Sequence, residues 1–174
     1  MHDNQVVATM FFDKEPDLSR LLERLPKDAM FQVLEEPDKL LADVLSSLDD
    51  IFRGNDTKLC CFKVNIGQLS GYAQRVLEYT RLIPVGYVTT YGALADVAGG
   101  SARSVGNVEA SNMVPLLIPC HRVVRSDLTV GGYGFGANVK FEILKQEDKG
   151  YEESTTVTVD DKKLVLFPVK WVKK

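Results

Sequence analysis

The sequence has little of what marks membrane, secreted or fibrous proteins. No stretch of its 174 residues approaches the roughly 18 to 20 consecutive apolar residues of a membrane span. Residues 1–12 carry no basic segment of the kind that starts a secretory signal peptide. The 7 prolines and 13 glycines form no repeat or low-complexity segment. With 45% hydrophobic and 26% charged residues, we expect a cytosolic globular protein with a buried core.

Cysteine is also scarce, and its arrangement argues against crosslinks and metal sites. The cysteines are Cys60, Cys61 and Cys120, an odd set with two adjacent members, so we expect reduced thiols and no disulfide framework. Tetrahedral zinc needs four ligands at chelating spacings, and the sequence contains no CxxC or HxxxH pair. We therefore predict no metal site.

The chain has no excess of positive charge. Its 21 basic and 24 acidic residues give a net charge of -3, which taken globally argues against a nucleic-acid-binding protein. The charge is uneven, however, because residues 1–74 carry 8 basic and 13 acidic residues whereas residues 75–150 carry 8 and 7. This asymmetry permits a second half that faces a polyanion beside an acidic first half.

The first third alternates extended and helical patterns, which predicts a small N-terminal α/β domain over residues 1–66. The predicted strands are 6–12, 30–34 and 59–66, and the predicted helices are 16–25 and 37–52. Gly54 is expected to end the second helix. Residues 67–71 are polar and bounded by glycine, so we interpret them as a linker.

Two short helices follow, over 91–98 and 102–110, joined by Gly99-Gly100 and with Ser101 as a predicted N-cap. This is the helix-turn-helix pattern, although any corner between two helices gives it too. The other predicted elements are helices over 72–82 and 138–147, a strand over 88–90 and a hairpin over 155–167. We expect the hairpin to be only a structural edge.

The most informative segment is Pro-Leu-Leu-Ile-Pro-Cys-His-Arg-Val-Val at residues 115–124, where two prolines bracket an apolar run that leads to Cys120. A reactive thiol needs a nearby cation or base to stabilise its thiolate, and His121 and Arg122 could provide both. The alternative is that Cys120 is a buried small hydrophobe, as Cys60 and Cys61 in their apolar strand are expected to be.

These residues resemble the active-site region of the O6-alkylguanine-DNA alkyltransferases. The resemblance runs from Gly71 to Gly150, rests on residues 119–123 with Asn112 before them, and includes 88–95, 102–106 and 140–147. It implies a small α/β, ribonuclease H-like N-terminal domain followed by a mostly helical, winged-helix-like domain, an α+β protein as a whole. The implied divisions are 1–66, a linker 67–71, the DNA-binding domain 72–150 and an extension 151–174.

The resemblance implies that Cys120 accepts an alkyl group from O6-alkylguanine, irreversibly, once per molecule and without a cofactor. His121 would act as the base through a water, with Glu147 orienting its imidazole. The damaged nucleotide would be flipped out of double-stranded DNA. We expect a monomer that binds no membrane and works on the nucleoid in the cytoplasm of a prokaryote, or in the nucleus of a eukaryote.

The resemblance also assigns residues to the DNA and the flipped base. Arg103 would fill the space that the base leaves, Tyr91 would rotate the phosphate and supply a proton to the leaving guanine, and Asn112 would be a hinge. The other residues placed at substrate or DNA are Ser101, Arg122, Val123, Tyr133, Gly134, Phe135 and Lys140. Four of the assigned residues also have an ordinary structural interpretation. These are Arg103 as a surface charge, Tyr91 as a core aromatic, Asn112 as a local turn former and Glu147 as a solvated carboxylate.

Residues that depart from the family pattern include Gly134, Phe135 and, on the recognition helix, Asn107, Glu109 and Ala110. Gly134 stands where many relatives carry serine. Because the contacts expected at this position come from the main chain, the change should be tolerated. Phe135 stands where relatives often have a small residue, so methyl and ethyl groups should react while benzyl groups react slowly. Glu109 stands where relatives often carry methionine and is expected to bring a negative charge near DNA phosphates, weakening DNA binding.

Two other functions stay open from the residues. A non-catalytic module that binds alkylated DNA would fit the helix-turn-helix, but the alkyltransferase-like proteins lack the cysteine. A cysteine hydrolase would use Cys120 and His121, but adjacent Cys and His residues rarely form a direct dyad and the usual local signatures are absent.

Overall fold

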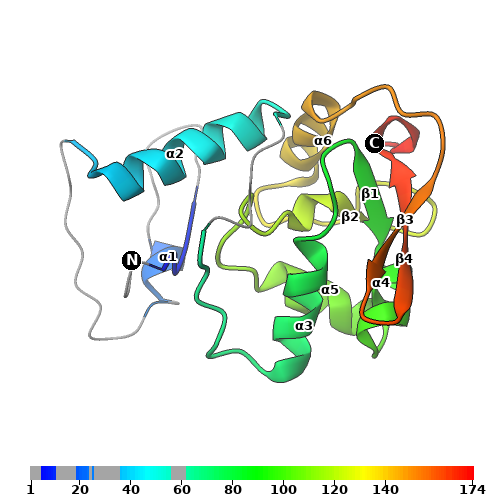
Figure 1. Ribbon diagram of the computed structural model, residues 1–174, viewed down its shortest axis with the longest axis horizontal. Helices are drawn as coiled ribbons and strands as arrows, with labels where there is room; N and C mark the ends of the chain where they lie inside the picture. The colour runs from blue at the N-terminus through cyan, green and yellow to red at the C-terminus, as the bar shows by residue number, and fades with distance from the viewer. Residues whose placement is uncertain (1–4, 11–18, 24, 26–35, 56–61) are drawn as a thin grey trace.

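The computed structural model describes residues 5–10, 19–23, 25, 36–55 and 62–174. They form a mixed α+β protein, as predicted (Figure 1). The helices are α1 (Ser19–Leu22), α2 (Lys39–Phe52), α3 (Gly71–Thr80), α4 (Tyr91–Ala98), α5 (Ala102–Ala110) and α6 (Ala137–Gln146), with 3-10 turns η2 (Cys120–Arg122) and η3 (Val169–Trp171). The strands are β1 (Tyr87–Thr90), β2 (Val123–Val124), β3 (Thr155–Val159) and β4 (Lys162–Pro168). Among the described helices, none is both long and apolar enough to span a bilayer.

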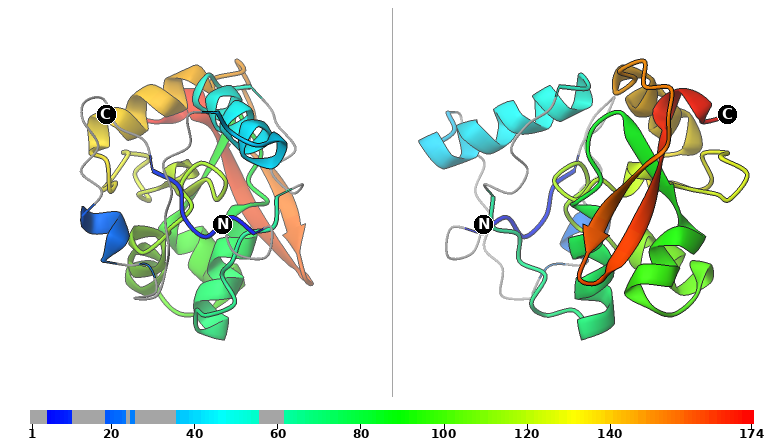
Figure 2. Two further views of the ribbon diagram at one scale, coloured as in Figure 1. Left: turned by 90° about the vertical axis from the view of Figure 1, so that its left-hand side faces the viewer. Right: turned by 45° about the vertical axis from the view of Figure 1, so that its right-hand side comes forward.

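The long helix α2 confirms the prediction for residues 37–52. It begins at Asp38, whose Oδ1 accepts a hydrogen bond from the N–H of Leu41 at 2.8 Å. Gly54 ends it with a φ of +76°, and a Cβ at this position would lie 1.9 Å from the carbonyl oxygen of Gln146. The C-terminal end of α2 therefore lies against the end of α6 (Figures 1 and 2).

Other predictions for the front third are met only in part. The helix expected over 16–25 is described as the shorter α1. The strands expected over 6–12 and 59–66 meet, within the described residues, only in a parallel bridge between Val6 and Val64. The two described segments do not pair further, because the N–H of Thr9 donates instead to the carbonyl oxygen of Met113. The strand expected over 30–34, Cys60 and Cys61 lie outside the described residues.

The sheet has the strand order β2-β1-β4-β3, so the predicted hairpin is not an edge feature as a whole. Strand β4 lies inside the sheet, with Val88 of β1 opposite Phe167 in antiparallel register. Leu164 and Leu166 are fully buried in the main core. Strand β4 of the segment 151–174 belongs to the main sheet, because its alternating apolar residues fill the sheet face that α4 covers.

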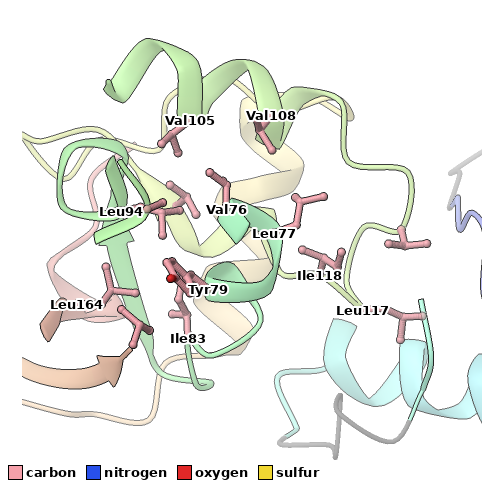
Figure 3. Close-up of a cluster of buried hydrophobic side chains, with 14 of the residues drawn as sticks. Val76, Leu77, Tyr79, Ile83, Leu94, Val105, Val108, Leu117, Ile118 and Leu164 are labelled. Carbon is pink, nitrogen blue, oxygen red and sulfur yellow. The ribbon is translucent and has the colours of Figure 1, made fainter. Parts of the chain in front are cut away.

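The main core lies between the helices α3, α4 and α5 and the sheet. In Figure 3, Val105 and Val108 point from α5 toward Val76 and Leu77 of α3. Leu94 of α4 joins the same cluster and is fully buried. Each helix thus presents one apolar face to the others, which fixes α4 and α5 relative to the rest of the domain.

The two short helices α4 and α5 form with the predicted bounds. Gly99 and Gly100 adopt φ values of +86° and +87°, which glycine adopts without steric cost. Ser101 caps α5 by accepting a hydrogen bond from the N–H of Ser104 at 3.2 Å. The Ser104 hydroxyl lies 2.8 Å from Oη of Tyr72 on α3, and a Cβ on Gly100 would come within 2.7 Å of that Oη. The turn therefore needs glycine at this position.

The tip of the hairpin supports this unit from the other side. Nζ of Lys162 donates to the carbonyl oxygens of Asp96 at 3.0 Å and Val97 at 3.3 Å, which end α4. The hydroxyl of Tyr79 on α3 donates to the carboxylate of Asp160. A cation at the carbonyl end of a helix is favourable, so Lys162 stabilises α4. The contact between Tyr79 and Asp160 holds the hairpin against α3.

Replacing Leu164 by alanine should lower the free energy of unfolding by about 2–5 kcal/mol, because it leaves a cavity in the core. The matched control is Val165→Ala in the same strand, whose side chain is 38% exposed and should cost less than about 1 kcal/mol. Urea denaturation followed by circular dichroism measures both. Equal losses for the two variants would contradict a core role for the hairpin.

Candidate active site

Cys120 opens the 3-10 turn η2, directly after Pro119 and directly before strand β2. Strand β2 pairs in parallel with β1, with Val123 opposite Thr89. The side chain of Cys120 is buried, with 6% of its surface exposed. The predicted thiol is therefore held just before the start of the edge strand β2, whose pairing with β1 fixes the backbone there.

Asn112 organises the loop of residues 112–119 that leads to Cys120. Its Nδ2 donates to the carbonyl oxygen of Ile118 at 2.9 Å, and its Oδ1 accepts from the N–H of Val114 at 3.0 Å. Near the N-terminus, Thr9 bonds the same loop, with its N–H donating to the carbonyl oxygen of Met113 at 2.9 Å. Asn112 thus joins the end of α5 to the cysteine through both halves of its amide.

Behind Cys120, three charged or polar side chains form one buried cluster, made of His121, Arg122 and Glu147. Arg122 donates from Nε to Oε2 of Glu147 at 2.9 Å and from Nη2 to Oε1 at 2.7 Å, and Nε2 of His121 lies 3.0 Å from Oε1. Burial alone would raise the pKa of Glu147, but its interactions and hydrogen bonds with His121 and Arg122 outweigh burial and lower the pKa to about 2. Glu147 is therefore ionised.

The ionised carboxylate determines the tautomer of His121. A carboxylate can only accept hydrogen bonds, so Nε2 of His121 must be the donor and Nδ1 must carry the lone pair. Burial lowers the pKa of His121, although the charge of Glu147 opposes it, so the imidazole is neutral. Nδ1 is buried and has no hydrogen-bond partner among the described residues. His121 is thus a neutral base with its accepting nitrogen available.

The expectation that Arg122 contacts DNA or stabilises a Cys120 thiolate is wrong. Its side chain is 1% exposed. Besides its bonds to Glu147, Nη1 donates to the carbonyl oxygen of Ile83 at 2.6 Å. The guanidinium holds the carboxylate of Glu147 and the backbone just after α3. It must be paired in this way because an unpaired buried charge would be costly.

Lys140 is also buried, which corrects its expected role as a DNA contact. Its Nζ donates to the carbonyl oxygen of Val123 at 2.6 Å and lies 5.7 Å and 5.9 Å from the ring centroids of Tyr91 and Tyr133. Burial lowers the pKa of Lys140 to about 8. The ammonium therefore links β2 to two of the aromatic residues expected at the substrate.

The cysteine itself is neutral in the DNA-free protein. Burial, and then the charge of Glu109, raises the pKa of Cys120 to about 12, while Asn112 and Lys140 act in the opposite direction. We expected a thiolate stabilised by His121 and Arg122; instead Arg122 is engaged by Glu147 and His121 is neutral. Proton removal must therefore accompany the reaction.

Two tyrosines flank this thiol. Tyr91 is the first residue of α4, half-buried, and burial raises its pKa to about 12. Tyr133 lies in the glycine-rich loop 131–136, and burial and the neighbouring Cys120 raise its pKa. Its hydroxyl is buried without a hydrogen-bond partner among the described residues. Both phenols therefore stay protonated and can donate.

Other predicted substrate residues lie on or near the surface. Phe135 is half-buried, with its ring centroid 5.6 Å from that of Tyr133, and Gly134 between them is exposed. Ser101 and Arg103 are exposed at the start of α5. The structure thus brings Cys120, His121, Glu147, Asn112, Tyr91, Tyr133 and Lys140 together. It leaves Ser101 and Arg103 on the outer surface of the helix-turn-helix.

Glu109 does not face outward as expected. It is 7% exposed, and its Oε1 lies 2.6 Å from Oγ1 of Thr80 on α3. The signal was in the sequence, because Glu109 follows Val105 and Val108 at i+4 and i+1, on the apolar stripe of α5. The prediction of a negative charge beside DNA phosphates is therefore wrong.

The buried charges of α6 carry the same overlooked signal. Lys140 and Glu147 lie at i and i+7 on the stripe that Ile143 and Leu144 occupy at i+3 and i+4. Glu147 is the C-cap of α6. A charged residue on the apolar stripe of a helix indicates that it is buried with a partner. The position of Lys140 or Glu147 in the sequence does not reveal which residue that partner is. Across the described residues, no three His, Cys, Asp or Glu side chains group so that they could hold a metal ion.

Comparison with known proteins identifies the family. Residues 71–149 match the model of the 6-O-methylguanine DNA methyltransferase, DNA binding domain. A methylated-DNA–protein-cysteine methyltransferase of Methanothermobacter thermautotrophicus is 35% identical over 116 residues, 67% of this chain and 66% of the relative. One of Mycobacterium leprae is 34% identical over 124 residues, 69% of this chain and 72% of the relative. The chain belongs to the 6-O-methylguanine DNA methyltransferase family.

A solved structure agrees with this assignment. Mycobacterium tuberculosis OGT in complex with DNA superposes with a TM-score of 0.56 at 26% sequence identity, covering 67% of this chain and 78% of that one. The chain spans slightly less than two thirds of the length of the Methanothermobacter relative.

Replacing Glu147 by glutamine should lower the free energy of unfolding by about 3–5 kcal/mol at neutral pH, because Arg122 is left buried without a counter-charge. The pKa of Glu147 in the folded protein lies below its ordinary value of 4.5. Its stabilising contribution is therefore complete above that value and is lost as the pH falls toward about 2. The variant should lose this acid-dependent part of the stability.

The control is Glu142→Gln on the same helix, which pairs with Lys145 at the surface where both side chains are 57% exposed. It should cost about 0–1 kcal/mol. Urea unfolding between about pH 3 and pH 7 compares the three proteins. A Glu147→Gln variant as stable as the control would show that the cluster does not hold the fold.

Proposed function

We propose that this chain repairs DNA by transferring the alkyl group of O6-alkylguanine, mainly O6-methylguanine, to Sγ of Cys120. The observation that carries the proposal is the buried thiol next to a neutral imidazole whose other nitrogen is held by an ionised carboxylate. A thiol with a raised pKa needs a base to become a nucleophile, and this arrangement supplies one. Family membership supports the same reaction.

The proton of the Cys120 thiol passes to Nδ1 of His121, through one bridging water. The imidazolium that forms is stabilised by Glu147, which already accepts from Nε2 at 3.0 Å. Lys140 adds a positive charge that lowers the pKa of Cys120. The thiolate therefore forms inside the protein, where little water competes for it.

The thiolate attacks the alkyl carbon, an S–C bond forms and the C–O6 bond breaks. The electron pair of that bond goes to the guanine, which takes a proton to become ordinary guanine. Tyr91 is the proposed donor, since its raised pKa keeps the phenol protonated. The product is a thioether, a poor leaving group, so each molecule acts once.

The helix-turn-helix is the proposed DNA-binding unit, in a winged-helix-like domain. The N-terminus of α5 is exposed at Ser101 and Arg103, where the helix dipole and the guanidinium both favour phosphate. Arg103, exposed near the start of α5, is proposed to enter the stack when the base leaves it. The N-terminal part, proposed to be ribonuclease H-like, supports the loop of the cysteine through Thr9.

The acceptor is tested by mixing the protein with duplex DNA that carries one O6-methylguanine. Intact-protein mass spectrometry should find the mass of one methyl group per chain, located on the peptide with Cys120. Cys120→Ser should still bind the duplex but gain no mass. Binding without a mass shift by the wild type would favour a damage-binding module, and turnover of ester substrates would favour a hydrolase.

Phe135→Gly tests the size of the alkyl group. The Phe135 ring stands next to that of Tyr133 and is proposed to narrow the space for a bulky alkyl group. The variant should react with O6-benzylguanine roughly tenfold faster or more, since such a steric term is worth about 1–3 kcal/mol. Its rate on O6-methylguanine, the internal control, should change little. Equal benzyl rates for both proteins would refute the steric role.

A further inference from the structure

Glu109 is a buried carboxyl group that the mechanism above does not use. It comes from the helix α5 and is 7% exposed. Its Oε1 contacts Oγ1 of Thr80 at 2.6 Å, and its Oε2 is buried without a hydrogen-bond partner among the described residues. Unlike Glu147, it forms no ion pair with any Lys, Arg or His of the described chain. A buried carboxylate without a paired cation is costly and tends to take up a proton instead.

The hydroxyl of Thr80 stabilises a charge on Glu109 only in part. Oγ1 lies 2.9 Å from the carbonyl oxygen of Val76, one turn earlier in α3, as well as 2.6 Å from Glu109. A hydroxyl has a single hydrogen but two lone pairs. Thr80 therefore cannot donate at full strength to both Val76 and Glu109, so it lowers the pKa of Glu109 by less than burial raises it.

Glu109 also lies in the same cluster as the reacting groups. Gly106, one turn earlier on α5, packs against the ring of Tyr91, where a Cβ would lie 3.9 Å from the ring. The ring of Tyr91 in turn contacts the ammonium of Lys140. The titratable groups facing Glu109 are thus Tyr91 of α4, Cys120 of η2 and Lys140 of α6, and a charge on Glu109 acts on each of them.

We propose, resting on the proposed alkyl transfer, that Glu109 is a positioning residue which stays a neutral carboxylic acid on Thr80 while Cys120 reacts. Its ionisation places a negative charge near the nucleophile and opposes formation of the thiolate. Burial raises the pKa of Glu109 to about 7, so ionisation falls in the physiological range. Lys140 loses its charge at slightly higher pH and adds to the effect in the same direction.

The test is the single-turnover rate of methyl transfer at saturating DNA between about pH 6 and pH 8.5. Glu109→Gln keeps an acceptor for Thr80 but cannot ionise. Its rate should match that of the wild type near pH 6 and exceed it by roughly tenfold near pH 8.5, the size expected for a nearby charge at an effective dielectric constant of about 20. The control Glu142→Gln should follow the wild type throughout.

A constant ratio of the two rates across the pH range would overturn the proposal. So would a pH-independent loss of rate with weaker DNA binding, since that marks a merely structural role. Thr80→Val provides a second variant that leaves Glu109 in place. The Thr80 hydroxyl lowers the pKa of Glu109, so its removal should move the decline of the rate to higher pH.

Carbon NMR of the DNA-free protein labelled at glutamate carboxyls separates this proposal from the repair function. One carboxyl should titrate near pH 7, and its signal should be absent in Glu109→Gln. A Glu109 carboxylate already ionised at about pH 6 would overturn the proposal even if methyl transfer is observed. A wild type that titrates as expected but transfers no methyl group would instead count against the proposed function.

Discussion

The buried cluster of Arg122, Glu147 and His121 is the interaction on which the rest of the site depends. One carboxylate takes two bonds from a guanidinium and a third from an imidazole, and all three side chains are almost fully removed from solvent. Arg122 extends the cluster to the carbonyl of Ile83, just after α3. The same contacts that tie α6 to the cysteine segment therefore determine which nitrogen of His121 can accept a proton. These hydrogen bonds therefore serve both the packing of α6 and the choice of the His121 tautomer.

Two buried glutamates lie around one cysteine, and their surroundings give them opposite properties. Glu147 has a cation in direct contact, so its pKa falls to about 2. Glu109 is buried with only one hydroxyl of the described residues bonded to its carboxyl, and burial raises its pKa to about 7 because that one hydrogen bond does not offset it. The residue type is the same, and the difference comes from the partner that another segment of the chain provides. The carboxylate of Glu147, which supports the imidazole of His121, is thus ionised. The carboxyl of Glu109, whose charge would oppose a thiolate at Cys120, is more easily protonated.

Sequence patterns predicted the elements with strong local signals. The apolar spacing gave α2 and the cap at Ser101 gave α5 nearly to the residue, and the glycine pair gave the turn. The motif around Cys120 located the site. What could not be predicted depends on contacts between distant segments. The insertion of β4 between β1 and β3 is such a case, and so is the burial of Arg122 and Lys140, which resemble surface cations until their partners are known.

The interior position of β4 has a consequence for the order in which the molecule is assembled. Strand β1 carries the chain into α4 and pairs with β2 next to the cysteine, but its other edge is covered only by residues 162–168. During synthesis on the ribosome, the segments that hold the thiol emerge well before the strand that completes their sheet. The nascent domain must therefore expose an unpaired strand edge for a time, and the reactive cysteine matures only after most of the chain has been translated.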